Sequence, residues 1–461
     1  MIPQSRPARH NFSFRCLFFA SSFIVGVLML CMGIMHTTCA QNSKLGSIKT
    51  DCGVYPEGPA PALPPAGGIV YDQIFGAEIM RVTDEQDGTN LGTYYSYWPT
   101  FNKNNSRLLV KGESGTGFIR SFNPTSFTLG AKESIPSIPG VGYPMFEGAA
   151  WSGRDPDVLY ASANASIYAY NAATKAYTLV KDLASRIPAG EYFLQMSKSL
   201  DDDYFAFTRR TANWQIAGYV VYRKSTDTLT VKNEPTLDEV TISKNGRYLL
   251  VKMYRSTGDP VESRVLDTVS GTLENLIDGI PDYAPGHGDA GVDCYVGYDD
   301  WRNQINYRKL STPHTFTTIL EINDWTNGAI HTSMLADNEE WALIGFFGGE
   351  TSVPFRNEVI QIATDGSQRI QRLFHHRSVY RNYYDSPRAN ISRDGRFVAF
   401  TSNWGGQART DLFVAKIQSV APVVGIQRQA RLPRRLRTRH PRQHLLRPSP
   451  CRAKTSSGRV N

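Results

Sequence analysis

The 461-residue chain carries 50 Lys and Arg against 42 Asp and Glu, and this positive excess is confined to its two ends. Three Arg precede residue 41 and eleven basic residues follow residue 419, which leaves 36 basic and 42 acidic residues between them, a net charge of −6. The central part therefore offers no general basic surface for nucleic acid, and it is long enough to build one large hydrophobic core.

The first 40 residues are typical of a signal peptide. Three arginines among the first 15 residues form a cationic start, residues 17–35 are apolar, and Thr38-Cys39-Ala40 supplies the small residues of a cleavage site. We expect a secreted or periplasmic protein. The alternative is an uncleaved anchor, because the apolar run approaches the length of a membrane span, and this would be the chain's one link to a membrane.

Two further segments differ from the central part in composition. Residues 41–67 are rich in Pro and predict an extended linker. Residues 420–461 contain ten Arg and one Lys but no Asp or Glu, and they lack apolar periodicity. We expect a disordered tail there. The alternatives are a functional basic arm and the translation of a shifted reading frame.

The central part repeats one β-meander. Residues 240–251 give the clearest copy, in which two apolar strands flank Asn245-Gly246, a strong signal for a tight hairpin. Asp394-Gly395 makes the same signal in the last copy. Seven hairpins begin near residues 98, 149, 194, 240, 287, 331 and 387. Their spacing of 44–56 residues is close to the roughly 40–50 residues of a propeller blade.

Residues 68–419 are therefore predicted to form an all-β, seven-bladed propeller of four-stranded antiparallel blades. The last repeat ends after its third strand, at Ile417, and a spare strand pair precedes the first repeat. We expect residues 77–83 to supply the missing outer strand, so that the N-terminal strand closes the ring and covers an exposed sheet edge. The alternatives are an open run of meanders and a two-sheet sandwich.

Two hairpins carry the pattern of a known repeat. Ile391-Ser392-Arg393-Asp394-Gly395-Arg396 and Ile242-Ser243-Lys244-Asn245-Gly246-Arg247 resemble the WD40-like (PD40) repeats of TolB-type propellers, and Trp98-Pro99-Thr100-Phe101 resembles their first half. The segment from His375 to Gly405 is also similar to oligogalacturonate-lyase propellers. Both resemblances imply the propeller fold, and the second implies a polysaccharide lyase.

Candidate site residues lie where a propeller exposes its central channel, at the start of the innermost strands. We expect one face to carry Tyr95, Trp98, His287, His331, Arg388 and Asn390. Aromatic side chains near Tyr95 would form a platform for a sugar or a peptide. The alternative is that these aromatic residues only pack between blades.

A metal site is a second expectation for this face. His287 and His331 occupy corresponding places in successive repeats and are candidate ligands for a divalent metal, manganese or calcium. The lyase resemblance implies manganese held partly by a Gln-x-x-His-Pro-His stretch, which falls on residues 383–388. Tyr383, Ser386 and Arg388 stand there instead of the ligands. Arg388 is then a candidate to bind a carboxylate of an acidic ligand.

Three functions stay open from the sequence. The leading hypothesis is a monomeric, non-catalytic binding or scaffold module for a glycan or protein partner. The alternative is a metal-dependent oligogalacturonide lyase with a degenerate metal site, and the third is a peptide-binding partner in an envelope complex. Outside the two ends only Cys52 and Cys294 occur, and they either pair or leave Cys294 buried and free.

Overall fold

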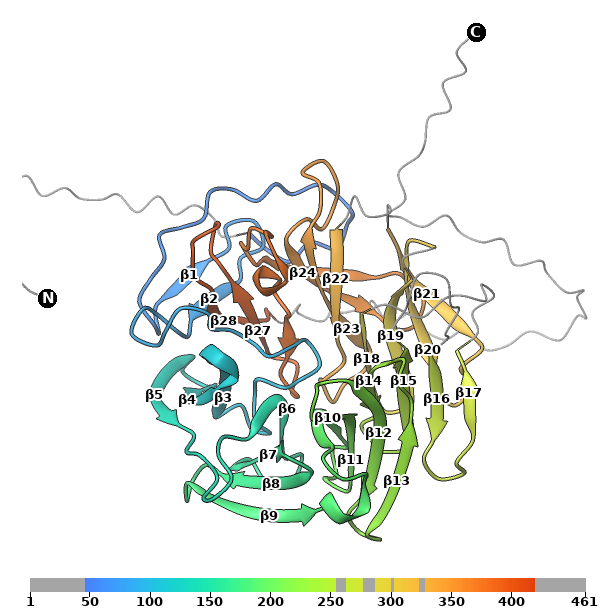
Figure 1. The fold of residues 1–461 in the computed structure, drawn as a ribbon. Helices are drawn as coiled ribbons and strands as arrows, with labels where there is room; N and C mark the ends of the chain where they lie inside the picture. The colour runs from blue at the N-terminus through green and yellow to red at the C-terminus, as the bar shows by residue number, and fades with distance from the viewer. Residues whose placement is uncertain (1–45, 254–262, 277–286, 300–301, 323–327, 419–461) are drawn as a thin grey trace, which may run out of the picture. The chain divides into compact units, whose positions relative to one another are not determined.

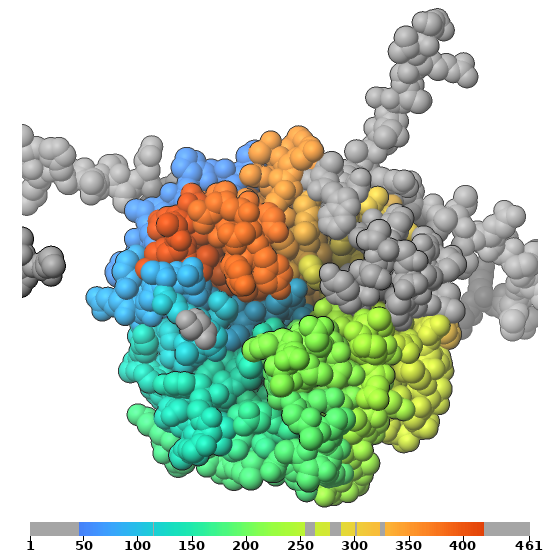
Figure 2. Space-filling model, viewed as in Figure 1, coloured from blue at the N-terminus to red at the C-terminus, as the bar shows by residue number. Residues whose placement is uncertain are grey.

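The computed structural model describes residues 46–253, 263–276, 287–299, 302–322 and 328–418. Within these ranges seven antiparallel sheets stand around one centre, so the predicted seven-bladed, all-β propeller is confirmed (Figure 1). In the space-filling view the colours follow chain order around the same face (Figure 2). The predicted signal peptide and the predicted Arg-rich tail lie outside the described residues.

The blades are numbered here in chain order, and each strand is bonded to the next within its sheet. Blade 1 is β3 (Arg107–Lys111), β4 (Gly117–Asn123) and β5 (Thr128–Ser134), with a 3-10 turn, η1 (Glu113–Gly115), between the first two. Blade 2 is β6 (Met145–Trp151), β7 (Val158–Ala163), β8 (Ser166–Asn171) and β9 (Ala176–Asp182), followed by η2 (Ala184–Arg186). Blade 3 is β10 (Tyr192–Lys198), β11 (Tyr204–Arg210), β12 (Ile216–Arg223) and β13 (Thr228–Asn233).

The second half of the ring continues this pattern. Blade 4 is β14 (Leu237–Ile242), β15 (Tyr248–Met253), β16 (Arg264–Asp267) and β17 (Leu273–Asn275). Blade 5 is β18 (Gly288–Ala290), β19 (Cys294–Asp299), β20 (Gln304–Lys309) and β21 (Phe316–Glu321). Blade 6 is β22 (Gly328–Ser333), β23 (Trp341–Gly348), β24 (Glu358–Ala363) and β25 (Ile370–His375). Blade 7 contains η4 (Tyr383–Asp385), β26 (Asn390–Ile391), β27 (Phe397–Ser402) and β28 (Asp411–Lys416).

Blade 1 departs from the four-stranded pattern because its innermost segment is not a regular strand. Residues 98–101 reach β3 through a bridge between Phe101 and Leu108 and through the Leu109 N–H, which donates to Thr100 O at 2.8 Å. The described sheet therefore has three strands, although the expected inner segment lies beside it.

The hydrophobic core lies between the blades. Each neighbouring pair of blades shares one apolar cluster, and the pair formed by blades 7 and 1 is included, where Phe397 and Leu412 pack with Leu108 and Phe118. This arrangement explains why β27 is buried along its whole length, with apolar side chains on both faces. Strands that pack on two neighbours read as apolar runs instead of alternating patterns.

The hairpin turn of the last blade is built around a serine instead of the expected two-residue turn. Gly395 alone adopts a left-handed conformation (φ 72°), and its N–H donates to Ser392 O at 2.9 Å. The Ser392 hydroxyl donates to the Asp394 carboxylate at 2.7 Å and accepts from the Phe397 N–H at 3.0 Å. The Ser-x-Asp-Gly pattern therefore ties the end of one strand to the start of the next.

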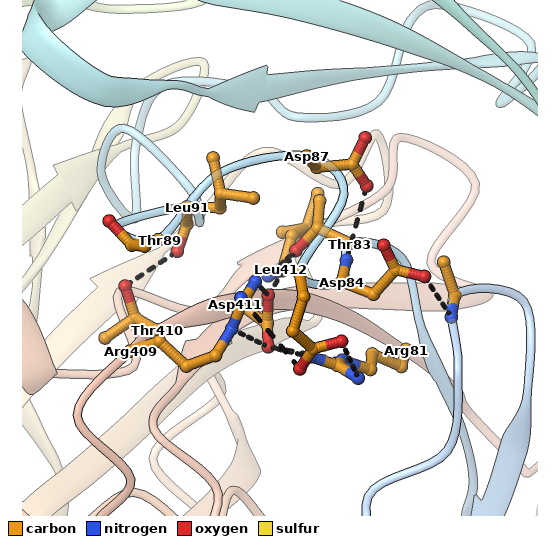
Figure 3. Close-up of polar contacts among 12 residues, drawn as sticks. Arg81, Thr83, Asp84, Asp87, Thr89, Leu91, Arg409, Thr410, Asp411 and Leu412 are labelled. Atoms are coloured by element: carbon orange, nitrogen blue, oxygen red, sulfur yellow. Dashed lines mark hydrogen bonds and ion pairs between the residues drawn. The ribbon is translucent and has the colours of Figure 1, made fainter. Parts of the chain in front are cut away.

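The N-terminal strands join the last blade. β1 (Ile69–Tyr71) pairs with β2 (Glu78–Arg81), and β2 pairs antiparallel with β28, in the order β1-β2-β28-β27-β26. Side chains reinforce this seam, as Figure 3 shows. Arg81 donates to the Asp411 carboxylate at 2.7 and 3.2 Å, and the Thr83 hydroxyl donates to the other oxygen of Asp411 at 2.9 Å.

Residues 46–67, the described part of the segment 41–67 that was expected as a linker, lie against blades 6 and 7. His375 Nε2 is 3.0 Å from Tyr55 O, Arg377 donates to Gly58 O at 3.0 Å, and the Trp404 indole N–H donates to Pro61 O at 2.8 Å. We call this segment the strap. Its backbone carbonyls are hydrogen-bonded by buried side chains of the ring.

The fold settles whether the two cysteines of the central part pair with each other. Cys294 is a free, buried thiol, so it does not pair with Cys52. Among the residues that the structure describes, no helix is long and apolar enough to cross a membrane.

Candidate functional site

The innermost segments of all blades begin at the same end of the ring, and there the predicted residues meet. Tyr95 lies at the centre of this group. Its ring centroid is 4.8 Å from that of His331, 6.4 Å from that of His287 and 6.4 Å from that of Tyr383. The two histidine rings are 4.9 Å apart. We call the group formed by Tyr95, His287, His331, Tyr383 and Arg388 the channel mouth.

His331 is a buried imidazole without a hydrogen bond. It lies in β22 opposite Gly345, is 0% exposed, and packs its ring 4.8 Å from that of Phe347. Within the described part of the chain neither ring nitrogen has a hydrogen-bond partner. Burial, and then the positive fields of His287 and Arg388, hold its pKa well below the usual value. The ring is therefore neutral, with one free donor and one free acceptor.

His287 differs because it is engaged. Its Nδ1 lies 3.3 Å from Ile330 O, and its own carbonyl accepts from the Thr332 hydroxyl at 3.4 Å. Both contacts tie the segment before β18 to β22 of the next blade. They fix the imidazole beside Tyr95 and His331.

Arg388 is a buried cation without a counter-ion in the described ranges. It is 3% exposed, its Nη2 donates to Tyr384 O at 2.9 Å, and its Nε has no partner there. No Asp or Glu of those ranges lies within ion-pair distance of its guanidinium, which sits 5.7 Å from the Tyr383 ring centroid. Burial lowers its pKa, although the guanidinium stays charged. An uncompensated buried charge of this kind favours binding of an anion.

Lys111 adds a second cation that the sequence analysis did not select. It ends β3, and its ammonium lies 5.7 Å from the Tyr384 ring centroid. Burial and then the field of Arg388 lower its pKa, so the two cations are close enough to repel each other. The register of blade 1 brings Lys111 to the mouth, and a sequence pattern does not reveal that register.

Carboxylates lie on the side of the mouth formed by blades 2 and 4. Glu239 is satisfied, because its Oε1 accepts from the Tyr97 hydroxyl at 2.5 Å and from the Lys252 ammonium at 2.7 Å. Glu147 in β6 and Asp238 in β14 form no ion pair within the described residues. Both side chains are exposed, yet partial desolvation, and then the negative charge of Glu239, raise the pKa of both carboxyl groups. The positive charge of Lys111 acts in the opposite direction on Glu147.

Trp98 and Asn390, which were predicted to contact a ligand, are buried and hydrogen-bonded within the ring. The Trp98 indole N–H donates to Met196 O at 3.1 Å, and its ring packs in the cluster between blades 1 and 2. The Asn390 amide donates to Tyr95 O at 3.2 Å and to the Thr100 hydroxyl at 3.1 Å, and its oxygen accepts from the Thr100 N–H at 3.3 Å. Asn390 therefore holds Tyr95 in place.

A mainly apolar cavity occupies the channel beneath this layer. All seven blades contribute to its wall, which includes Tyr97, Trp98, Trp151, Met196 and Ile391. The basic side chains at its rim are already engaged, since Lys244 pairs with Glu339 at 2.8 Å and Lys198 with Asp202 at 2.5 Å. Among the described residues, no buried side-chain atom that lacks a hydrogen-bond partner belongs to the wall of this cavity, whereas those of His331 and Arg388 lie in the mouth.

The donor set of the mouth does not fit a divalent metal. His287 and His331 are neighbours, but no third His, Cys, Asp or Glu of the described ranges joins them in a group able to hold a metal ion. Arg388 and Lys252 add positive charge beside His331. Manganese and calcium sites need several oxygen or nitrogen donors and tolerate nearby cations poorly.

Comparison with known proteins identifies the fold of the chain but not its site. No family model matches the chain, and no curated protein matches it. Among solved structures, an oligogalacturonate lyase from Vibrio parahaemolyticus matches with a TM-score of 0.58 and 10% sequence identity, over 78% of this chain and 98% of that one. The chain has the fold of the oligogalacturonate lyases.

Two further structures belong to the same comparison. An oligogalacturonate lyase in complex with manganese matches with a TM-score of 0.57 and 12% identity, over 78% of this chain and 99% of that one. TolB from Acinetobacter baumannii matches with a TM-score of 0.36 and 13% identity, over 61% and 63%. The predicted likeness to the oligogalacturonate-lyase propellers is thus confirmed, and at this identity it establishes the fold.

Proposed function

We propose that the protein is a binding propeller whose channel mouth takes an acidic glycan. Arg388 carries this proposal: a guanidinium that is 3% exposed, with an unpartnered Nε and no carboxylate beside it in the described ranges, lacks the anion that would compensate its burial. A sugar carboxylate supplies that charge and accepts two parallel N–H bonds. Lys111 adds a second positive charge on the same side.

Exposed aromatic residues beside these cations favour a glycan. Tyr383 and Tyr384 are 47% and 64% exposed, and their ring centroids are 5.8 Å apart. Tyrosine rings offer a flat apolar face with a polar edge, which suits the apolar face of a sugar ring. The structures that share the fold are named for oligogalacturonate, a polymer of acidic sugars, and this supports the same ligand class here.

The proposed function is binding without catalysis, and a catalytic lyase is the second candidate function. Likeness in fold to the oligogalacturonate lyases favours a lyase with a degenerate metal site. The two imidazoles without a third donor favour the non-catalytic reading. An exported location, as the first 40 residues predict, would bring either protein into contact with extracellular or periplasmic polysaccharide.

Calorimetric titration with trigalacturonate tests the proposal, with the neutral galactose trisaccharide as a matched control. We expect binding of the acidic sugar alone, weakened about 100-fold by Arg388→Ala and about tenfold by Lys111→Gln. Equal binding of the two sugars, or none, contradicts the proposal. Release of an unsaturated uronate, followed by ultraviolet absorbance in the same samples with and without added manganese, would establish the lyase.

A further inference from the structure

The face of the ring that carries the channel mouth also carries an exposed tryptophan. Trp214 lies in the loop between β11 and β12 and is 61% exposed. β11 runs antiparallel to β10, with Arg210 opposite Tyr192, so this loop lies at the end of blade 3 where its innermost strand begins. The innermost segments of all blades begin on the side of the mouth, and Trp214 therefore shares this face. Along the ring, blades 1 and 2 lie between blade 7 and blade 3.

The loop fixes Trp214 in a strained conformation. Its backbone is left-handed (φ 64°), which is uncommon for a bulky residue and costs free energy. The Trp214 N–H donates to Thr211 O at 2.9 Å, and Arg210 Nη1 donates to Trp214 O at 2.8 Å. Its ring centroid lies 5.6 Å from that of Tyr192, and the two ring planes meet at 76°. An exposed tryptophan that its neighbours hold in a strained backbone conformation indicates a contact with a ligand.

Polar groups without partners surround this tryptophan. Arg210 Nε, Thr211 Oγ1 and the Tyr192 hydroxyl form no hydrogen bond with the described residues, and all three side chains are half-buried. Arg210 also forms no ion pair within the described ranges, although its charge lowers the pKa of two exposed carboxyl groups nearby, those of Glu147 and Asp238. We call the group formed by Tyr192, Arg210, Thr211 and Trp214 the outer platform.

The outer platform repeats the chemistry of the mouth. In the mouth, Arg388 has an Nε without a partner in the described ranges and lies 5.7 Å from the ring centroid of the half-exposed Tyr383. In the outer platform, Arg210 has an Nε of the same kind and bonds the backbone of the exposed Trp214. A polymer of acidic sugars presents an apolar ring face and a carboxylate at every repeat, so one chain can contact both places.

We infer that the ligand is a long acidic glycan, which places one sugar in the channel mouth and stacks a more distant sugar of the same chain on Trp214. The inference rests on the proposed function and deepens it, because it names a polymer as the ligand. Contact at the mouth makes the second contact intramolecular, so the affinity rises once the chain is long enough to reach the outer platform. A protein that contacts the glycan at the mouth alone gains only the statistical factor that a longer chain offers more registers.

Calorimetric titration of the whole protein with trigalacturonate and with dodecagalacturonate tests the inference. The gain in affinity from the short to the long chain is compared between the wild type and Trp214→Ala, because the statistical factor is the same in both. We expect a gain about tenfold larger in the wild type, reduced about threefold by Arg210→Gln and largely retained by Trp214→Phe, which keeps a flat ring. Trp341→Ala is the matched control and keeps the full gain, since Trp341 is a half-buried tryptophan at the start of β23, the end of blade 6 away from the mouth.

The outcomes separate this inference from the proposed function. Equal gains in the wild type and in Trp214→Ala overturn the long ligand, whereas loss of trigalacturonate binding in Arg388→Ala still supports the mouth. A gain that Trp341→Ala loses as strongly as Trp214→Ala also overturns it, because the effect would not belong to the outer platform. Dodecagalacturonate binding that survives Arg388→Ala and is lost in Trp214→Ala contradicts a chain anchored in the mouth. Failure of both oligomers to bind the wild type overturns the proposed function itself.

Discussion

The Lys252 ammonium lies 2.7 Å from the Glu239 carboxylate, at a place in the channel where both side chains are only 8% exposed. The same ammonium lies 4.5 Å from the centroid of the Tyr97 ring, whose hydroxyl bonds Glu239. This group forms the floor of the mouth and joins blade 4 to the inner segment of blade 1. The charges of Lys252 and Glu239 compensate each other, whereas the charge of Arg388 has no counter-ion among the described residues.

Breaking this pair is expected to destabilise the fold strongly. Lys252→Met leaves a buried carboxylate without its cation, which costs about 3–5 kcal/mol of unfolding free energy. Urea denaturation measures this loss. The double variant Lys252→Met/Glu239→Leu removes both charges, so it should recover a large part of the stability. A single variant as stable as the wild type would show that solvent reaches the pair.

The seam between β2 and β28 makes a second prediction. Arg81→Met removes the guanidinium that bonds Asp411, where the two side chains are 3% and 2% exposed, and should cost about 3 kcal/mol. Arg369→Met is the matched control, because its pair with Asp365 is more than half exposed and should contribute no measurable stability. Equal melting temperatures of the two variants would contradict a structural role for the seam.

Acid sensitivity is expected to arise partly at His376. Its Nε2 lies 2.8 Å from Phe346 O and its Nδ1 accepts from the Ser378 N–H at 3.0 Å, an arrangement that requires the neutral ring. Burial lowers its pKa to about 3, so the unfolded chain takes up the proton first. Stability is then lost as the pH falls below about 6.5, by about 2 kcal/mol between pH 7 and pH 5.

Unfolding of His376→Gln at both pH values measures this contribution, because the variant should lose about 2 kcal/mol less on acidification than the wild type. His375→Gln serves as the opposite case. Burial lowers the pKa of His375, but the hydrogen bond and charge of Asp72 outweigh it and raise the pKa. Its stabilisation is therefore present below the ordinary pKa and lost as the pH rises through the raised one. Identical slopes in all three proteins would refute both assignments.

His331 should matter for binding more than for stability. His331→Phe keeps a flat ring beside Tyr95 and Phe347 and removes two buried nitrogens that lack partners among the described residues. We expect the unfolding free energy to change by less than about 1 kcal/mol and the affinity for trigalacturonate to fall about tenfold. A variant that loses stability without losing affinity would give His331 a structural role.

The sequence predicted the fold well because blade geometry is local. Each hairpin carries its own signal, such as Ser392 and Gly395 bracketing a turn, and a repeat of that signal implies a ring. The two-residue turn was wrong in detail. Only the glycine takes a left-handed conformation, because the serine hydroxyl holds the rest of the turn.

The candidate site was predicted less completely, because the sequence does not reveal how the strands of a blade are aligned with one another. The structure brings His287, His331 and Arg388 together because they lie at corresponding places in successive inner segments. Lys111 was missed, since it ends β3, outside the innermost segment of its blade, and reaches the mouth only through strand pairing. Trp98 looked like an exposed platform, yet its indole is hydrogen-bonded between blades, and no sequence pattern distinguishes these two orientations.

The contacts of the strap and of the N-terminal strands affect the order in which the chain can fold during synthesis. Arg81 and Asp411 are 330 residues apart along the chain, and the side chains that hold the strap come from blades 6 and 7. The segments made first are therefore completed by those made last. During synthesis, β2 has no β28 to pair with until the last blade has been made. The N-terminal strands can therefore reach their final pairing only after the rest of the ring has been synthesised.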